Sequence, residues 1–148
     1  MSLQTDIIFI KAIKADEELS EQLGGRIYST AIPLPDEELD NAPLPYAIVS
    51  YMGMDNDGQT KDDPYEGETD SVHISVEVAA KTRTELAQLM ISVRDAVHGY
   101  FTDGHEEDEE DEALIPLDYQ LTAQPVTYDQ YKPCYWQVLD YQCDTYKD

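Results

Sequence analysis

The sequence is short of three things: long apolar runs, cysteines and basic side chains. No stretch approaches the roughly 20 consecutive apolar residues that a transmembrane helix needs, so no membrane partner is expected. No secretory signal is visible either, which predicts folding in a cytoplasm. The two cysteines, Cys134 and Cys143, are too few for a zinc site or a disulfide framework. We expect both to be reduced and partly buried.

The shortage of basic residues leaves a strongly acidic chain. It has 32 aspartates and glutamates against 9 lysines and arginines, a formal net charge of -23. Such a surface repels phosphates, which argues against direct binding to nucleic acid or to anionic lipid. Self-repulsion also means that any assembly needs a well-matched interface or screening salt. The hydrophobic content of 41% in 148 residues still predicts a packed core, in a single domain over residues 1–148.

The first element expected is a helix over Asp6–Leu23. Its apolar residues fall at helical spacings and predict one buried stripe, made of Ile7, Ile10, Ile13, Leu19 and Leu23. Asp16 is placed to cap a second short helical segment. Gly24 and Gly25 are expected to end the helix, because glycine adopts the positive φ of that position without a Cβ clash.

A second helix is expected after Thr82. Thr82 and Glu85 have the spacing of a capping box. The apolar stripe that follows consists of Leu86, Leu89, Met90, Val93 and Val97. We expect Gly99 to close this helix.

The remaining regular segments read as strands. The expected strands are Arg26–Ile32, Tyr46–Met52, Val72–Ala80, Leu117–Tyr128 and Cys134–Tyr146. A stiff, proline-rich loop or edge separates the first two, and the last two are expected to pair antiparallel through a short return. Two acidic segments, about 53–70 and 102–116, are expected to be mobile loops.

The resulting order is α-β-β-β-α-β-β. This predicts an α+β fold with two helices packed on one face of a mainly antiparallel, possibly mixed, sheet.

No catalytic or metal-binding motif stands out. With Gly58 at the sixth position of a calcium loop, the twelfth is Pro64, where a bidentate carboxylate is required. The histidines His73, His98 and His105 form no spaced metal motif, and the acidic run that begins at His105 is typical of a solvated segment. We therefore expect no catalytic, cofactor or metal site, and no enzymatic activity.

Aromatic residues concentrate near the C-terminus instead. Six of the eleven tyrosines follow Asp118, and tyrosine is enriched at protein–protein interfaces. The expected assembly interface consists of Tyr119, Tyr128, Tyr131, Tyr135, Trp136 and Tyr141, with Tyr65, Asp57 and Asp62 from the first acidic loop. The alternative is that the tyrosines only cover the outer face of a two-sided sheet.

Three segments carry a resemblance to a known family. They are the turn Gly25-Arg26-Ile27-Tyr28, the strand entry Leu44-Pro45-Tyr46, and the strand Val72–Ala80, which passes through Thr82 into a helix with Val93-Arg94 near its end. In this order and spacing the chain resembles the tail completion, or tail terminator, proteins of long-tailed bacteriophages. The resemblance covers roughly residues 7–97.

The resemblance implies a structural role in a virion. Proteins of that family form a ring, usually hexameric, on the head-proximal end of the tail tube, where they stop tube polymerisation and join the head connector. The implied partners are copies of the chain itself, the tail tube protein and the connector protein. Assembly would take place in the cytoplasm of a bacterial host, from a phage or a prophage. A negative lumen would let DNA pass without sticking, because it offers phosphates no cations.

Two other functions remain open from the sequence. An acidic inhibitor that mimics DNA should spread its carboxylates over rigid helices and strands, whereas many of the acids here lie in two loops. A divalent-cation-binding module would have to bind through carboxylates that lack a complete loop motif.

Overall fold

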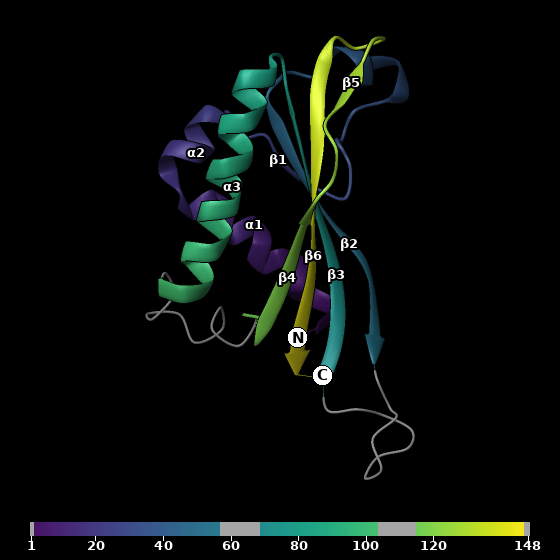
Figure 1. Cartoon of the computed structure of the whole chain (residues 1–148). Coiled ribbons are helices and arrows are strands. Elements are labelled where there is room, and N and C mark those ends of the chain that lie inside the picture. Colours follow the sequence, from purple (N-terminus) through teal and green to yellow (C-terminus); the bar gives the residue numbers. More distant parts are fainter. Residues whose placement is uncertain (1, 57–68, 104–114, 147–148) are drawn as a thin grey trace.

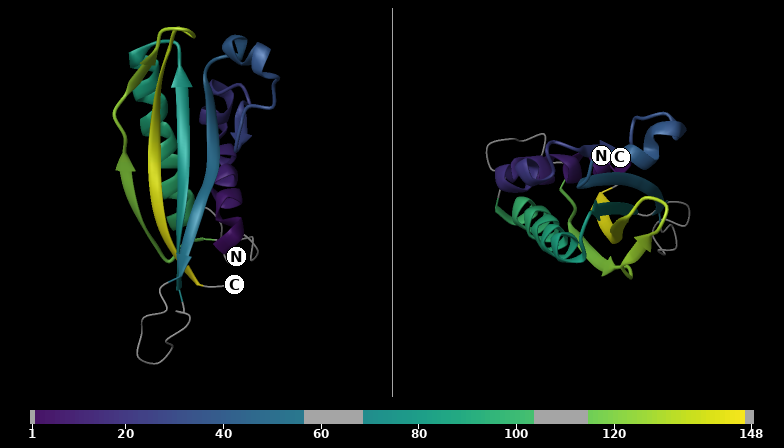
Figure 2. Two further views of the ribbon diagram at one scale, coloured as in Figure 1. Left: turned by 90° about the vertical axis from the view of Figure 1, so that its right-hand side faces the viewer. Right: turned by 90° about the horizontal axis from the view of Figure 1, so that it is seen from above.

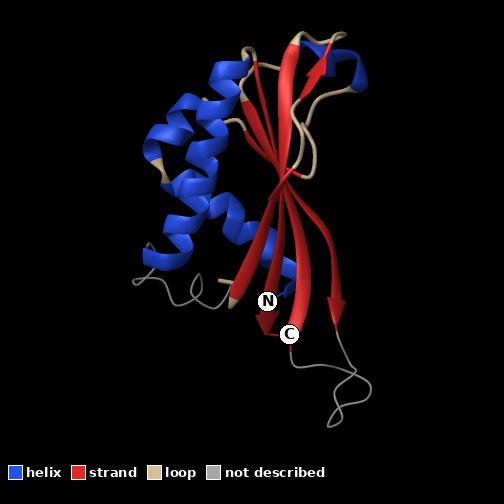
Figure 3. Cartoon of the chain, in the orientation of Figure 1, coloured by secondary structure: helices blue, strands red, loops and turns tan. Residues whose placement is uncertain are grey.

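The computed structural model describes residues 2–56, 69–103 and 115–146 of the chain. Its helical segments are η1 (Ser2–Gln4), α1 (Thr5–Ala15), α2 (Glu17–Gln22), η2 (Asp36–Asn41) and α3 (Arg83–Asp103). Its strands are β1 (Ile27–Ser29), β2 (Tyr46–Asn56), β3 (Thr69–Ala80), β4 (Asp118–Ala123), β5 (Thr127–Asp129) and β6 (Cys134–Tyr146). The α-helices lie along one side of a twisted sheet (Figures 1 and 3), which confirms the predicted α+β class.

The sheet has six strands in the order β1-β2-β3-β6-β4, and β5 pairs with β6 beyond the end of β4. β1 runs parallel to β2, and every other pairing is antiparallel, so the sheet is mixed. At the centre, Val76 of β3 faces Val49 on β2 and Leu139 on β6. The long central strands therefore carry the hydrophobic core, and the short strands form the edges.

The core lies between the sheet and the helices. The predicted alternation of β3 is confirmed by the buried side chains of Val72, Ile74, Val76, Val78 and Ala80; Asp70 on the same face and Ala79 at the end of the strand are buried as well. Of the predicted helical stripe, Ile13, Leu19 and Leu23 are buried and Ile10 is partly buried, but Ile7 is 41% exposed. In α1 the buried residues are Thr5, Ile8, Phe9, Ala12 and Ile13. Because α1 contacts both α3 and β2, the buried face of this helix is wider than the stripe that residue spacing predicts.

Both ends of the short second helix follow the sequence prediction. The Asp16 side chain accepts a hydrogen bond from the Leu19 amide at 3.0 Å, which caps α2. Gly24 and Gly25 have φ of 61° and 73°, the left-handed conformation expected after a helix.

The start of α3 was predicted correctly and its end was not. The Thr82 hydroxyl accepts a hydrogen bond from the Glu85 amide at 3.2 Å. The helix continues through Gly99 to Asp103, so the prediction that Gly99 closes it was wrong. In the last turn of α3, Phe101 packs edge-on against Phe9 with 5.2 Å between ring centroids, a tertiary contact that the local preference of glycine does not take into account.

Several strand boundaries differ from the predictions. β1 stops at Ser29 because Thr30 has a φ of 71°, which an extended strand does not accommodate. β2 continues to Asn56 and β3 starts at Thr69, so the predicted loop over 53–70 is shorter at both ends. Asp103 likewise belongs to α3. The predicted mobility of the two acidic loops concerns segments centred on 57–68 and 104–114, which lie outside the described residues.

Two local elements were not foreseen. The proline-rich loop contains the 3-10 helix η2. The predicted strand over 117–128 is divided into β4 and β5, because Pro125 offers no amide hydrogen to the ladder. Ala123 faces Leu139 and Thr127 faces Trp136, so three residues of the outer strand lie opposite two of β6. Both cysteines are free and buried, as predicted.

Arg26 connects two of the segments that carry the family resemblance. Its Nε donates to the carbonyl of Pro45 at 2.8 Å, and its Nη2 donates to the carbonyl of Leu44 at 3.2 Å. Directly beyond, Ile27 and Tyr28 of β1 pair with β2. The glycine–arginine turn and the proline strand entry therefore form one structural unit. None of the helices in the described ranges has the length and apolar character needed to cross a membrane.

Candidate functional site

The strongest candidate for a contact surface is the hairpin that joins β5 to β6. Tyr131 is 85% exposed at its tip and Tyr128 is 53% exposed on β5. Together with Trp136 on β6 they surround a shallow hollow, and we call these three side chains the hairpin surface. The Tyr128 ring packs on Tyr135 with 4.9 Å between centroids, so the surface rests on fixed aromatic rings.

The hairpin tip has a defined turn. The Asp129 carboxylate accepts hydrogen bonds from the amides of Tyr131 at 3.0 Å and Lys132 at 3.2 Å. Lys132 is buried, and its ammonium donates to the Leu39 carbonyl of η2 at 3.3 Å. The same ammonium lies 4.9 Å from the ring centroid of Tyr46. Exposed aromatic side chains are therefore presented on a turn that is anchored to the body of the fold.

Burial at this anchor also affects titratable groups. Desolvation is the main reason why the pKa of Tyr46 is raised to about 12, and the nearby Glu77 carboxylate acts in the same direction. Burial likewise raises the pKa of Glu77, against the opposing effect of Lys132. The Tyr46 hydroxyl therefore stays protonated at neutral pH, and the anchor gains no charge from it.

The structure separates the six aromatic residues predicted at the interface into two groups. It gathers Tyr128, Tyr131, Tyr135 and Trp136 at the hairpin. Tyr141 is only 2% exposed and belongs to the core, so its predicted place at an interface is corrected. Tyrosine at that position fills the space against Phe9, at 4.8 Å between centroids.

Tyr119 occupies an intermediate position on β4. It is half-buried, its ring lies 5.6 Å from Tyr141, and its hydroxyl forms a 2.6 Å hydrogen bond with Nδ1 of His98. The remaining predicted residues, Tyr65, Asp57 and Asp62, lie outside the described residues.

A second apolar surface was missed by the sequence analysis. Leu3 is 63% exposed and Ile7 41% exposed at the start of the helical layer, and Met52 and Met54 are 64% and 38% exposed on β2. α1 packs along β2 (Figure 2), and Met54 lies opposite Val72 of the core, so Leu3, Ile7 and Met54 belong to one side of the sheet. We call these three side chains the N-terminal patch. Met52 belongs to the outer face, where it lines a pocket with His73 and Gln142. The apolar side chains of this patch are visible in the sequence, but the sequence pattern placed Ile7 in the buried stripe of the first helix.

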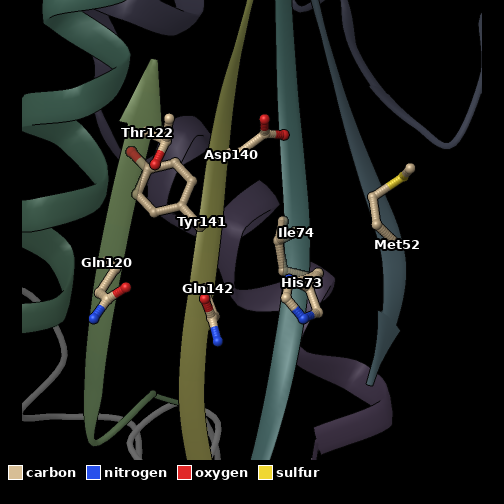
Figure 4. A pocket seen from close by; sticks show the side chains of 8 residues that line it. All are labelled: Met52, His73, Ile74, Gln120, Thr122, Asp140, Tyr141 and Gln142. Atoms are coloured by element: carbon tan, nitrogen blue, oxygen red, sulfur yellow. The ribbon is translucent and has the colours of Figure 1, made fainter. Parts of the chain in front are cut away.

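The outer face of the sheet, opposite the α-helices, is polar in its lower half. A pocket there is lined by side chains from four strands (Figure 4), among them Met52, His73, Gln120, Asp140 and Gln142. Gln142 donates to the Ser71 hydroxyl at 2.9 Å, and His73 lies 3.5 Å from the Asp55 carboxylate. Amides, a hydroxyl and carboxylates form a hydrogen-bonding surface rather than an apolar cavity.

Comparison with known proteins identifies the fold but not a family. No family model matches the sequence, and no curated protein sequence matches it. A chain of a solved structure described as "Virion of native gene transfer agent (GTA) particle" matches with a TM-score of 0.62 and 13% sequence identity. The match covers 96% of this chain and 94% of that chain. A gene transfer agent virion contains this fold. The similarity extends over nearly the full length, beyond the residues 7–97 that the sequence resemblance covers.

Proposed function

We propose that the protein is a structural component of a phage-derived particle and that it acts as a tail terminator. The observation that carries this proposal is the nearly full-length match to a chain of a gene transfer agent virion. The glycine–arginine turn and the proline strand entry, which Arg26 joins, support the finer assignment. The role is one of shape and contact and requires no chemistry.

The positions of the exposed apolar residues suit a ring. A closed head-to-tail ring needs two different patches on each protomer, one for each neighbour. The hairpin surface lies at one end of the sheet and the N-terminal patch at the other end (Figure 1). In the proposed assembly Tyr128 and Tyr131 of one copy pack against Leu3, Ile7 and Met54 of the next. Aromatic and methionine side chains are common at the centre of such interfaces.

The acidic surface fits a position around passing DNA. A net charge of -23 leaves few cations to pair with phosphates, so DNA can move through the ring without binding to it. In this proposal the ring, expected to be a hexamer, contacts the tail tube protein on one side and the head connector protein on the other.

Deletion of the gene from the producing phage or prophage tests the proposal. Electron microscopy should show tails that are overlong or not joined to heads, and the wild-type gene supplied in trans should restore joined particles. Particles of normal tail length would refute the terminator role. An acidic DNA mimic would leave tails unchanged and would instead displace DNA from its target protein.

Complementation with point variants tests the contact surface. A Tyr128→Ala, Tyr131→Ala double variant should fold normally and lower the yield of joined particles at least tenfold. The matched control is Ile91→Ala, which removes an apolar side chain that is 62% exposed on α3, outside both surfaces. Equal yields from the two variants would refute a role for the hairpin surface.

A further inference from the structure

β4 is an edge strand whose outer side is open within the described part of the chain. It pairs only with β6, and no described strand lies on its other side. The Gln124 amide donates to the Val138 carbonyl at 2.9 Å, so by antiparallel alternation Tyr119, Leu121 and Ala123 direct their backbone groups away from β6. The Tyr119 amide is satisfied by the Asp118 carboxylate at 2.8 Å. The backbone groups of Leu121 and Ala123 are left to face outward.

The other edge of the sheet consists of β1 and of the outer side of β2 from Ser50 to Asn56, where a bulge between Tyr51 and Gly53 interrupts the strand. β1 has only three residues and ends where Thr30 turns away with a φ of 71°. β4 has six residues and contains no lysine, proline or bulge, the usual means of blocking an edge strand. β4 is therefore the more regular of the two edges for pairing with an added strand.

The two faces of β4 specify different side chains for such a strand. On the helix side, Tyr119 and Leu121 pack against the core cluster, and the exposed Ala123 follows them. A strand added about 4.8 Å away would extend this apolar surface with alternate side chains of its own. Its apolar residues would therefore lie on the helix side.

On the opposite face, the carboxylate nearest to the added strand is Asp118 of β4, and two further carboxylates lie one strand away on β6. Asp118 of β4 lies directly opposite Asp144 of β6, and Asp140 follows two positions further along the same face of β6. Like charges directly opposite each other on neighbouring strands are destabilising. The described residues in the lower half of this outer face include no lysine or arginine, and His73 is their only basic side chain. Lysine or arginine on the added strand would relieve this repulsion.

We propose that the open edge of β4 binds an extended segment of a partner protein in which apolar residues alternate with lysine or arginine. Backbone hydrogen bonds to Leu121 and Ala123 supply the pairing, the apolar residues extend the core, and the basic residues lie beside Asp118, with Asp144 and Asp140 one strand further away. A second copy of this chain is disfavoured as the occupant because its own charge of -23 would repel the same face. The proposal is independent of the tail-terminator assignment and stands even if that role fails.

Binding of designed peptides tests this inference on the intact protein. The probe is a blocked, fluorescent octapeptide of alternating valine and lysine, measured by fluorescence anisotropy at low and at moderate salt. The control peptide has the same composition, but its four valines come first and its four lysines follow. We expect the alternating peptide to bind at least tenfold more tightly, because only a strand can place all its lysines on one face. Equal affinities would overturn the proposal, since they would indicate charge attraction alone.

Amide hydrogen exchange of the wild-type protein locates the binding without any substitution. The alternating peptide should slow exchange at Leu121 and Ala123, whose amides face outward, and leave the three-residue strand β1 unchanged. Protection that appears elsewhere, with none at these two amides, would overturn the proposal.

Variants of β4 separate backbone pairing from charge. Ala123→Pro removes one outward amide but no hydrogen bond to β6, and should weaken peptide binding about tenfold. Ala123→Thr is the matched control, because it keeps the amide, and it should bind as the wild type does. Asp118→Asn keeps the acceptor for Tyr119 and should reduce both affinity and its salt dependence. If the protein self-associates and Ala123→Pro abolishes this self-association, the occupant of the edge is a second copy of the chain. That result would overturn the proposal.

Discussion

The buried hydroxyl of Tyr141 provides a sharp test of the core. The side chain is 2% exposed, its ring packs against Phe9 and Tyr119, and its hydroxyl has no hydrogen-bond partner among the described residues. A buried polar group without a partner loses its hydration and regains nothing. Tyr141→Phe removes that hydroxyl and keeps the ring contacts, so the variant should be more stable than the wild type.

The expected size of the effect follows from the cost of an unpartnered group. That cost is about 1–3 kcal/mol, and the lower end applies to a hydroxyl replaced within the same ring shape. We expect a gain of about 1 kcal/mol in the free energy of unfolding, equivalent to a rise of roughly 3 °C in melting temperature for a chain of this size. Urea titration followed by Trp136 fluorescence and by circular dichroism measures it, and coincident curves confirm two-state unfolding.

Tyr119→Phe is the matched control with the opposite expected sign. The Tyr119 hydroxyl is hydrogen-bonded to His98 at 2.6 Å, and its ring lies 5.8 Å from that of Phe101. Its removal should cost about 0.5–1.5 kcal/mol, the net worth of one hydrogen bond. Destabilisation by Tyr141→Phe would refute the reasoning, because it would mean that the Tyr141 hydroxyl does have a partner.

Three further predictions concern single positions. Thr82→Ala removes the acceptor of the Glu85 amide and should lower the free energy of unfolding by about 1 kcal/mol in urea titrations, whereas no change would mean that the cap is not formed. Gly99→Ala should stabilise by roughly 0.5–1 kcal/mol in the same assay, because a Cβ there meets no atom within 4 Å and the position is helical; a loss would contradict the length of α3. Burial raises the pKa of Glu77 above 4.5, so the folded state holds this proton more tightly, and stability should fall as pH rises through that raised value. Glu77→Gln should therefore be the more stable protein at pH 7 and lose this advantage below pH 4, and a pH-independent difference would refute the assignment.

Local chemistry explains which elements the sequence predicted well. The side chains of Asp16 and Thr82 satisfy amides within their own helix ends, so caps could be read from spacing alone. The alternation of β3 was equally clear because a strand with one buried face repeats every two residues. The prediction that Gly99 ends the helix was wrong, because it relied on the local preference of glycine. The packing of Phe101 on Phe9 joins segments that are distant in the sequence, so spacing does not show it.

The sequence predicted the candidate site only in part, for the same reason. Clustering of tyrosines near the C-terminus indicated the hairpin surface, and Tyr128 and Tyr131 are exposed there. The sequence could not separate these two from Tyr141, because the spacing of tyrosines does not show which of them another element covers. Phe9 of α1 covers Tyr141, and local spacing does not predict this contact. The exposure of Ile7 depends in the same way on how α1 packs along β2.

By itself, the sequence determined the fold class, the acidic surface, the helix starts and the central strand, because each depends on composition or on neighbours a few residues apart. Only the tertiary structure decided which tyrosines are exposed, where the apolar patches lie and which edge of the sheet remains open. Those features arise from strand order and from contacts between distant segments, such as the pairing of β4 with β6. The possible interfaces of this protein are therefore properties of its packing, built on elements that its local sequence specifies.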